Sequence, residues 1–403
     1  MKDFRKDFPL LERKHRGNRL AYFDNAATSP KPVSVITAVQ EYYTQYSSNI
    51  HRGPNFLEGT ATEKYEETRT IVSRFINCHP QEVIFTPGAT AAFNLLARSW
   101  GETNLQEGDV VALSAAEHHA NLVPWLQLKE KIGIKIVYID IDEQGSLDRA
   151  SWQAILADPK LKLLSVTQAS NVLGQLYDLG PIISQAKERD IVTMVDACQS
   201  AAHARIDVTA LGCDFLIFSG HKVMGPTGVG VLYIRDGILA GLPPFMGGGG
   251  MITEVKEQSF VPAAGNQRFE AGTPAIESVI GLGAALGYLN SIGWPYINRQ
   301  EQQLAGYFLD KLAAFPFASL LGGQAGRLPL FSLALEDLHP HDAADLLGEE
   351  AIITRAGHHC AQPLHDRFGV PASLRASLAF YNTEEEIDRF FVALARIRES
   401  FLA

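Results

Sequence analysis

A series of short apolar segments between residues 109 and 234 constrains the fold of this chain more than any other feature. The segments are rich in β-branched residues and hold few polar side chains, which is typical of strands covered on both faces of a parallel sheet. In chain order they are DVVAL (109–113), KIVYID (135–140), LKLLSVT (161–167), IVTMV (191–195), DFLIF (214–218) and VGVLYI (229–234).

Helical patterns lie between most of these segments, at 116–131, 148–157 and 181–189. The last two segments are separated only by SGHKVMGPTG, which is too short for a crossover helix, so we expect them to pair antiparallel. The alternation predicts an α/β fold with a mostly parallel, doubly wound sheet. In such folds ligands bind beyond the carboxyl ends of the strands.

The C-terminal part of the chain has a different pattern. Residues 236–274 contain PP, GGGG and RFEAGTP, and we interpret them as long functional loops. Beyond them, helical and strand patterns alternate irregularly, and the capping box of Thr383 and Glu386 precedes the last helix. Strands are expected at 328–335, 351–355 and 373–380, and a helix at 295–314. The pattern predicts an N-terminal arm (1–20), a large domain (21–290) and a small α+β C-terminal domain (291–403).

Composition excludes several classes of protein. With 35 basic and 45 acidic side chains, the net charge of −10 leaves no continuous basic surface for a nucleic acid. Four cysteines without a CxxC motif favour a reducing compartment over a disulfide framework or a zinc site. No apolar run reaches the ~18 residues of a membrane-spanning helix, and the charged start MKDFRKDFPLLERKHRG does not resemble a signal peptide. We expect a cytoplasmic protein that binds no membrane, nucleic acid or metal.

Lys222 and Asp196 form the first pair of candidate catalytic residues. Lys222 directly follows an apolar strand, and a desolvated lysine there loses its proton easily and can form a Schiff base. Asp196 ends the preceding strand, where a carboxylate needs a positive partner such as the protonated ring nitrogen of pyridoxal phosphate. An exposed loop lysine and a helix-capping aspartate are the structural alternatives.

Two further segments offer a phosphate site and a stacking ring. In TPGATAAFN an amphipathic helix starts after Gly88, and its free backbone N–H groups and the Thr90 hydroxyl can bind a phosphate. His118 and His119 follow a strand, so one imidazole can stack on a flat aromatic cofactor. A histidine whose hydrogen bonds are satisfied at a helix start is the alternative, and each signal alone is weak.

The segments ITRAGHHCAQPL and SLRASLAF carry the remaining candidates. Cys360 stands beside His358 and His359 in a glycine-containing loop and can be a reactive thiolate. An inert cysteine is the alternative, since three ligands without a second cluster do not make a zinc site. Arg375 lies in an apolar strand, where its guanidinium needs either a substrate carboxylate or a structural ion-pair partner.

Other motifs are missing or lack their structural context. The chain has no Walker A, HExxH or GxSxG sequence. GLGAALG (281–287) imitates a dinucleotide-binding fingerprint, but it follows a helical segment instead of a strand, which favours close helix packing.

Taken together, these segments resemble the group II cysteine desulfurases, the SufS- and CsdA-type branch of the class V (fold type I) pyridoxal-phosphate enzymes. The similarity runs nearly end to end, from AYFDNAATSPKP to RASLAFYNT. SGHKxxGPTGxG is specific for this superfamily, and RAGHHCAQP together with RFEAGTP points to the group II desulfurases. The chain looks most like the CsdA-type members, which are also described as cysteine sulfinate desulfinases.

The resemblance implies pyridoxal 5'-phosphate bound covalently to Lys222, which would also move the Cα proton. Residues around the ring and phosphate would be Asp196 at the ring nitrogen, Gln199 at the ring oxygen, His119 stacked on the ring, Asn171 near ring and substrate, Thr90, Ser219 and His221 at the phosphate, and Thr273 from the neighbouring subunit of a homodimer. Arg375 would bind the substrate carboxylate, with Arg355 and His51 lining the pocket. Cys360, in the small domain, would accept the sulfur.

The expected reaction converts L-cysteine to L-alanine, with the sulfur captured as a persulfide on Cys360. A SufE-like acceptor protein would take this sulfur for iron–sulfur cluster assembly, and cysteine sulfinate and selenocysteine are expected further substrates. Selenocysteine lyase or sulfinate desulfinase as the main activity, an aminotransferase of the same fold, and a non-catalytic scaffold stay open. The chain departs from the family pattern at Ala89 and Ala91, where threonine and glutamate are common, and at Cys198, interpreted as a small packing residue in place of the usual alanine.

Overall fold

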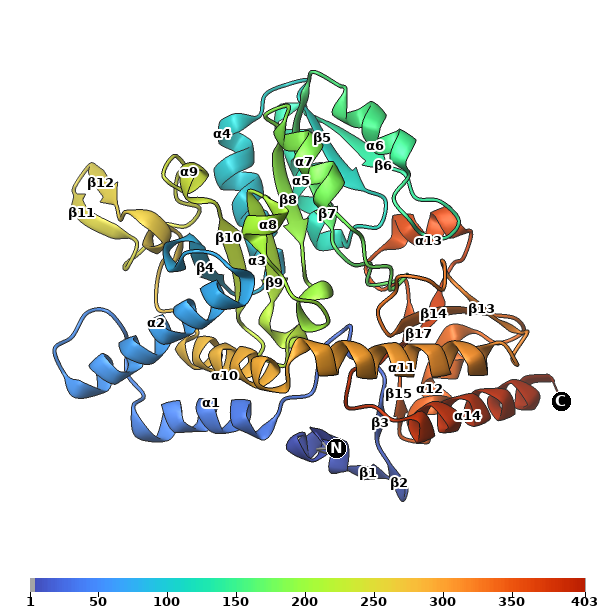
Figure 1. Cartoon of the computed structure of the whole chain (residues 1–403). Coiled ribbons are helices and arrows are strands. Elements are labelled where there is room, and N and C mark those ends of the chain that lie inside the picture. The colour runs from blue at the N-terminus through green and yellow to red at the C-terminus, as the bar shows by residue number, and fades with distance from the viewer. Residues whose placement is uncertain (1–3, 403) are drawn as a thin grey trace.

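A seven-stranded sheet organises the larger part of the chain, which the computed structural model describes from residue 4 to residue 402 (Figure 1). In spatial order its strands are β4 (Val83–Thr86), β10 (Gly230–Ile234), β9 (Phe215–Ser219), β8 (Val192–Asp196), β7 (Leu161–Thr167), β5 (Val110–Ser114) and β6 (Lys135–Ile139). From β9 to β6 all neighbouring strands are parallel, whereas β10 is antiparallel to both β9 and β4. The predicted α/β fold with a mostly parallel sheet and an antiparallel last pair is confirmed.

Both faces of this sheet are buried, as its apolar strands require. Alternate side chains of β10 enter different cores: Val231 and Tyr233 belong to one, and Leu232 and Ile234 to the other. The helices of this part are α1 (Val33–Gln45), α2 (Phe56–Ile76), α3 (Ala89–Leu96), α4 (Glu102–Asn104), α5 (Val123–Ile132), α6 (Arg149–Leu156), α7 (Gly180–Lys187), α8 (Val208–Leu211), α9 (Asp236–Leu239) and α10 (Ile276–Ile292).

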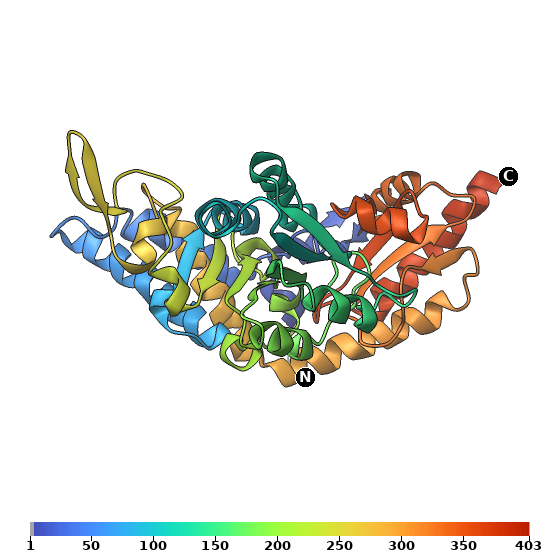
Figure 2. The same cartoon turned by 90° about the horizontal axis from the view of Figure 1, so that it is seen from above.

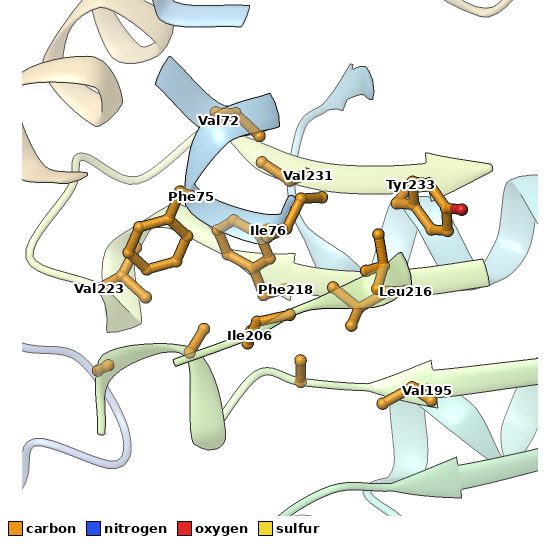
Figure 3. Packing of buried hydrophobic residues seen from close by; sticks show 14 of the residues in the cluster. Val72, Phe75, Ile76, Val195, Ile206, Leu216, Phe218, Val223, Val231 and Tyr233 are labelled. Atoms are coloured by element: carbon orange, nitrogen blue, oxygen red, sulfur yellow. The ribbon is translucent and has the colours of Figure 1, made fainter. Parts of the chain in front are cut away.

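The first of these cores also anchors the loop after β9. Figure 3 shows Phe75 of α2, Phe218 of β9 and Val223 packed together, and the two phenylalanine rings have centroids 6.3 Å apart. Val223 is fully buried and directly follows Lys222 in the chain. Packing of this one side chain therefore restrains the backbone that carries Lys222.

A second, antiparallel sheet organises the C-terminal part. In spatial order its strands are β13 (Ala318–Leu320), β14 (Leu330–Leu335), β17 (Ser373–Ser377) and β16 (Arg355–Gly357). The helices of this part are α11 (Trp294–Leu312), α12 (Pro340–Glu349), α13 (Gln362–Phe368) and α14 (Glu384–Leu402). Its own core includes Phe308 and Phe331, whose rings stack with centroids 3.9 Å apart.

The N-terminal segment packs on this C-terminal part. Strand β3 (Ala21–Tyr22) pairs in parallel with β15 (Ile352–Ile353), while β1 (Lys14–His15) and β2 (Asn18–Arg19) form a small hairpin. Arg5 makes a 2.6 Å ion pair with Glu386 at the start of α14, where the predicted capping box of Thr383 and Glu386 is present. Residues 1–3 of the predicted arm and residue 403 of the predicted C-terminal domain lie outside the described residues. The three domain boundaries stay a prediction.

Local structure differs from prediction in three places. Residues 116–131 do not form one helix, because α5 starts only at Val123, with a proline in its first turn. The segment 236–274, expected to be loops, contains α9 and the hairpin of β11 (Ile252–Lys256) and β12 (Ser259–Pro262). Most residues of this hairpin are exposed. Its strands therefore lack the apolar run from which a buried strand is predicted. The strand predicted at 351–355 is divided between β15 and β16, which belong to different sheets.

Candidate active site

A pocket of about 290 Å³ lies where β8 and β9 end, between the large sheet and the C-terminal part. Its position agrees with the expectation that ligands bind beyond the carboxyl ends of the strands. The residues singled out in the sequence that line it are Thr90, Asn171, Asp196, Gln199, Ser219, His221, Lys222, Arg355, Cys360 and Arg375. Three others, His51, His119 and Thr273, do not line it.

Lys222 is held by a turn that follows β9 directly. The carbonyl of the preceding residue, His221, accepts hydrogen bonds from the Ser29 backbone N–H (3.0 Å), the Thr28 hydroxyl (3.2 Å) and the Lys31 ammonium (3.0 Å). Burial lowers the pKa of Lys31 to about 8. Burial, followed by the charges of Lys222 and Lys31, lowers the pKa of the His221 ring to about 4, so this ring is neutral at pH 7. The sequence did not predict that residues 28–31 hold this carbonyl.

Asp196 is the last residue of β8 and is 4% exposed. Its Oδ1 accepts the backbone N–H of Cys198 at 2.8 Å, a local turn compatible with the capping alternative. Burial raises the pKa of Asp196, opposed by hydrogen bonds from Cys198 and by the charge of Lys222. A positive ring nitrogen at this carboxylate would keep it ionised. Burial, and next the charge of Asp196, raises the pKa of the neighbouring Glu117 to about 8.

The start of α3 faces the end of β9. The Ala89 backbone N–H donates to Ser219 Oγ at 3.0 Å, and Thr90 lines the same pocket. Strand β10 and the start of α3 approach closely here: a Cβ atom on Gly230 would lie 2.7 Å from Gly88, so only glycine fits. Backbone N–H groups and hydroxyls at a helix start are suitable partners for a phosphate.

The two neighbouring histidines take different places. His118 lines the pocket, and burial, then the charge of Lys222, lowers the pKa of its ring to about 3. His119, which was assigned the stacking role from the sequence, does not line the pocket: its Nε2 accepts the Gln362 backbone N–H at 3.1 Å. Neighbouring residues in a turn point in different directions, and sequence alone does not choose between them.

Cys360 lies on the loop between β16 and α13 and is the exposed one of the four cysteines. Both His359 (φ 51°) and Cys360 (φ 57°) have left-handed backbone, which is uncommon outside glycine. Contacts from segments that follow β5 and β7 hold the loop: the His119 backbone N–H donates to the Cys360 carbonyl at 2.7 Å, and Asn171 Nδ2 donates to the His359 carbonyl at 2.6 Å. The strained loop thus presents its thiol at the pocket.

Arg375 is 2% exposed and has an anionic partner in Asp24. Its Nη2 lies 3.2 Å from Asp24 Oδ1, its Nη1 donates to the Asn171 carbonyl at 2.9 Å, and Arg355 binds the same carboxylate at 2.9 Å. Burial lowers the pKa of Arg375 to about 10, against the opposing effect of Asp24. The ion-pair alternative is therefore realised, and Arg375 also lines the pocket. Asp24 belongs to the DNAATSPKP motif, and no local pattern in the sequence marks it as a partner of Arg375.

Gln199 is fixed by the same N-terminal segment. Its Nε2 donates to the Ala26 carbonyl at 2.9 Å, and both residues line the pocket. The motif DNAATSPKP therefore contacts the Lys222 turn, Gln199 and Arg375. The sequence signal that could have indicated these contacts is a polar motif without glycine that lies before a helix.

His51 and Thr273 line a separate pocket of about 500 Å³. Arg52, Gly250 and Glu270 line it as well, and His51 Nε2 lies 3.0 Å from Glu66 Oε1. One chain by itself does not bring these residues to Lys222. Thr273 was expected to act on the neighbouring subunit, so its role stays a prediction.

Residues 21–390 match the aminotransferase class-V family. The chain belongs to this family. Among class-V aminotransferases it is 43% identical to a probable cysteine desulfurase of Xylella fastidiosa (strain 9a5c) over 395 residues, which cover 98% of this chain and 95% of the relative.

Two solved structures are similar over the whole chain. A cysteine desulfurase from Thermococcus onnurineus NA1 has a TM-score of 0.94 at 37% identity and covers 99% of each chain. The cysteine desulfurase CsdA of Escherichia coli has a TM-score of 0.90 at 37% identity and covers 98% of each chain. The resemblance to CsdA-type group II cysteine desulfurases is confirmed.

Class-V aminotransferases use pyridoxal 5'-phosphate bound through a lysine, and this pocket fits that cofactor. It offers the amine of Lys222, the buried carboxylate of Asp196 for a ring nitrogen, a flat neutral imidazole in His118, and hydroxyls beside a helix start for a phosphate. Within residues 4–402, no group of three or more His, Cys, Asp or Glu side chains is arranged to hold a metal ion. In that same part of the chain, no helix has the length and apolar character for crossing a membrane.

Proposed function

We propose that this class-V enzyme is a pyridoxal-phosphate-dependent cysteine desulfurase that converts L-cysteine to L-alanine and captures the sulfur as a persulfide on Cys360. The observation that carries the proposal is an exposed cysteine at a pocket that also holds Lys222, Asp196 and Arg375. An aminotransferase of the same fold is less favoured, because amino-group transfer has no step for such a thiol.

Five side chains divide the work in this proposal, and four of them act on the substrate carboxylate, the cofactor and the Cα proton. Arg375 binds the substrate carboxylate, Asp196 would hold the ring nitrogen of the cofactor, and Lys222 Nζ removes and returns the proton at the substrate Cα. The chemistry that pyridoxal phosphate supplies when bound is an electron sink for the carbon that loses this proton. From the geometry of the pocket, we assign the stacking role to His118 instead of His119.

Sulfur transfer needs the thiolate form of Cys360. Its Sγ attacks the sulfur of the substrate, the bond between that sulfur and Cβ breaks, and the electron pair stays with Cβ. Protonation of Cβ then gives alanine, while the substrate sulfur stays on Cys360 as a persulfide. Cysteine sulfinate and selenocysteine have better leaving groups, so they should depend less on this thiol.

Cys360→Ala tests the proposal most directly. We expect the variant to keep the visible absorbance of the lysine-bound cofactor but to lose alanine formation from L-cysteine on the order of 10²-fold or more. In the parent enzyme, mass spectrometry of the Cys360 peptide after addition of L-cysteine should show one added sulfur atom.

Lys222→Ala is the matched control, because it should lose both the cofactor absorbance and all activity. Equal turnover of L-cysteine by the parent and Cys360→Ala would remove Cys360 from the mechanism. A keto-acid product in place of alanine would favour the aminotransferase alternative.

We infer further that the enzyme is a homodimer working in the cytoplasm with a SufE-like acceptor protein. Apolar side chains exposed on the β11–β12 hairpin, such as Val255 (64%) and Phe260 (55%), support association of two chains. The exposed position of Cys360 supports an acceptor that approaches the loop from outside. Four cysteines without a disulfide suit a reducing compartment.

A further inference from the structure

His359 is a buried histidine that the proposed reaction does not use. It directly precedes Cys360, lines the same pocket as Lys222 and Arg375, and is 8% exposed. Its Nε2 lies 3.0 Å from Ser373 Oγ, and Ser373 Oγ in turn lies 3.0 Å from Nε2 of His365. Its Nδ1 is buried and has no hydrogen-bond partner among residues 4–402. A buried polar atom without a partner is rare and needs an explanation.

The chain of contacts through Ser373 determines where the ring protons lie. His365 Nδ1 lies 3.2 Å from the Ala361 carbonyl, which can only accept, so Nδ1 of His365 carries the hydrogen. Burial lowers the pKa of His365, so the ring is neutral and its Nε2 accepts the Ser373 hydroxyl hydrogen. The Ser373 oxygen must then accept the hydrogen on Nε2 of His359. In a neutral His359 ring this leaves Nδ1 as a bare acceptor.

Arg375 has a donor that matches this acceptor. Its Nη1 and Nη2 bind Asn171 and Asp24, but its Nε–H is buried without a partner among the described residues. Ser373 and Arg375 are alternate residues of β17, so both side chains project from the same face of the strand. After burial, the charge of Arg375 is the largest influence that lowers the pKa of His359. One face of β17 thus brings the unpaired donor and the unpaired acceptor into one neighbourhood.

We propose that His359 is a positioning residue for Arg375: its Nδ1 accepts the Arg375 Nε–H when an amino-acid carboxylate binds, and so fixes the plane of the guanidinium. The inference rests on the proposed function, because it takes the substrate to be an amino acid held by Arg375. With Nε bound to His359, each of the three guanidinium nitrogens has a partner. The two outer nitrogens keep one N–H each for a bidentate grip on the carboxylate.

The alternative role for His359 is a base that takes the proton from the Cys360 thiol. Burial and the charge of Arg375 lower the pKa of His359 to about 2, so the ring does not hold a proton at neutral pH. A group that remains neutral is suited to accept a hydrogen bond and unsuited to act as a base. Positioning is therefore the role that both its geometry and its charge state support.

Two substitutions separate positioning of Arg375 from a general structural role. In His359→Asn the side-chain amide can place an oxygen near the Nδ1 position, but it cannot reach Ser373. In His359→Gln the longer amide can reach Ser373, but no acceptor stands at the Nδ1 position. The two ligands are L-alanine and ethylamine, which is L-alanine without its carboxylate. Their dissociation constants are measured in the holoenzyme from the change in the visible absorbance of the cofactor.

We expect His359→Gln to weaken binding of L-alanine roughly tenfold or more, the effect of one lost hydrogen bond to a charged group. Binding of ethylamine should change by less than about twofold, and His359→Asn should bind both ligands nearly as the parent does. Urea unfolding and the rate of Cys360 alkylation by iodoacetamide check that both variants keep the fold and the loop.

The proposal is overturned if His359→Gln binds L-alanine as tightly as the parent, or if it weakens both ligands equally. It is also overturned if His359→Asn is the weaker binder of L-alanine, since the contact with Ser373 would then be what matters. L-Cysteine is not used in this titration. Failure of the parent enzyme to make alanine from L-cysteine would therefore contradict the proposed function without touching the role of His359.

Discussion

At the scale of single residues, burial decides which histidines of the site are charged. His118, His221 and His359 line the pocket, and burial is the largest cause that lowers the pKa of each, to about 3, about 4 and about 2. The nearby cations Lys222 and Arg375 act in the same direction. The imidazoles of the pocket therefore serve as neutral surfaces and acceptors at pH 7.

This arrangement predicts a pH dependence of stability for His359. In the unfolded chain the histidine takes up a proton below its ordinary pKa of about 6.5, whereas in the folded protein it does not until about pH 2. The unfolded state binds more protons in this window, so stability falls as the pH decreases from about 6.5. We expect His359→Asn to flatten the loss of unfolding free energy by about 1 kcal/mol per pH unit between pH 6 and 5. Urea unfolding at pH 7, 6 and 5 measures this, and parallel curves for the two proteins would contradict it.

At the scale of one element, helix α10 shows how a sequence motif can mislead. Its GLGAALG segment is a packing surface, as the missing strand before it indicated. A Cβ atom on Gly281 would lie 2.5 Å from the ring of Pro226 and 2.9 Å from Val39 of α1, whereas one on Gly287 would meet nothing within 4 Å. Pro226 belongs to the loop that follows Lys222, so the close approach of α10 also supports the site.

The two glycines predict opposite effects of the same substitution. Gly281→Ala should destabilise the protein by about 1–3 kcal/mol, because the added methyl group overlaps a rigid proline ring. Gly287→Ala is its matched control and should stabilise by up to about 1 kcal/mol, because alanine is the better helix former at an exposed position. Urea unfolding compares the two variants, and a gain in stability for both would show that the approach of Pro226 is not tight.

At the scale of the whole molecule, the exposed apolar hairpin and the C-terminal helix lie at opposite ends (Figure 1, Figure 2). Hairpin β11–β12 projects from one end of the molecule (Figure 2). Its residue Ile252 lines the pocket that contains His51 and Thr273. In the proposed homodimer, this end of one chain would approach the Lys222 pocket of the other chain. Each of the two equivalent active sites in this dimer would then be built from segments that are distant in the sequence.

The proposed dimer predicts that charge on the hairpin separates the chains. Phe260→Asp should change the mass found by sedimentation velocity from that of two chains to that of one, because a buried carboxylate without a partner is costly. Val392→Asp is the matched control, since Val392 is 69% exposed and lies on α14 at the other end. A parent protein that sediments as a single chain would contradict the dimer directly.

The amino-acid sequence by itself determined the elements and the chemistry that each one presents. Apolar strands predicted the sheet, and their ends predicted where Asp196 and Lys222 stand, because alternation and turn residues act between neighbours in the chain. The cysteine loop and Arg375 could likewise be singled out from local pattern. Their catalytic roles stay predictions, although the structure brings all four residues to one pocket.

Only the tertiary structure decided which side chains meet across the pocket. Asp24 reaches Arg375 over 351 positions, and Asn171 reaches His359 over 188. That His118 and not His119 lines the pocket depends on how a turn packs against the Cys360 loop. Contacts of this kind depend on how distant segments of the chain pack together in the folded protein, and no local pattern of residues carries that information.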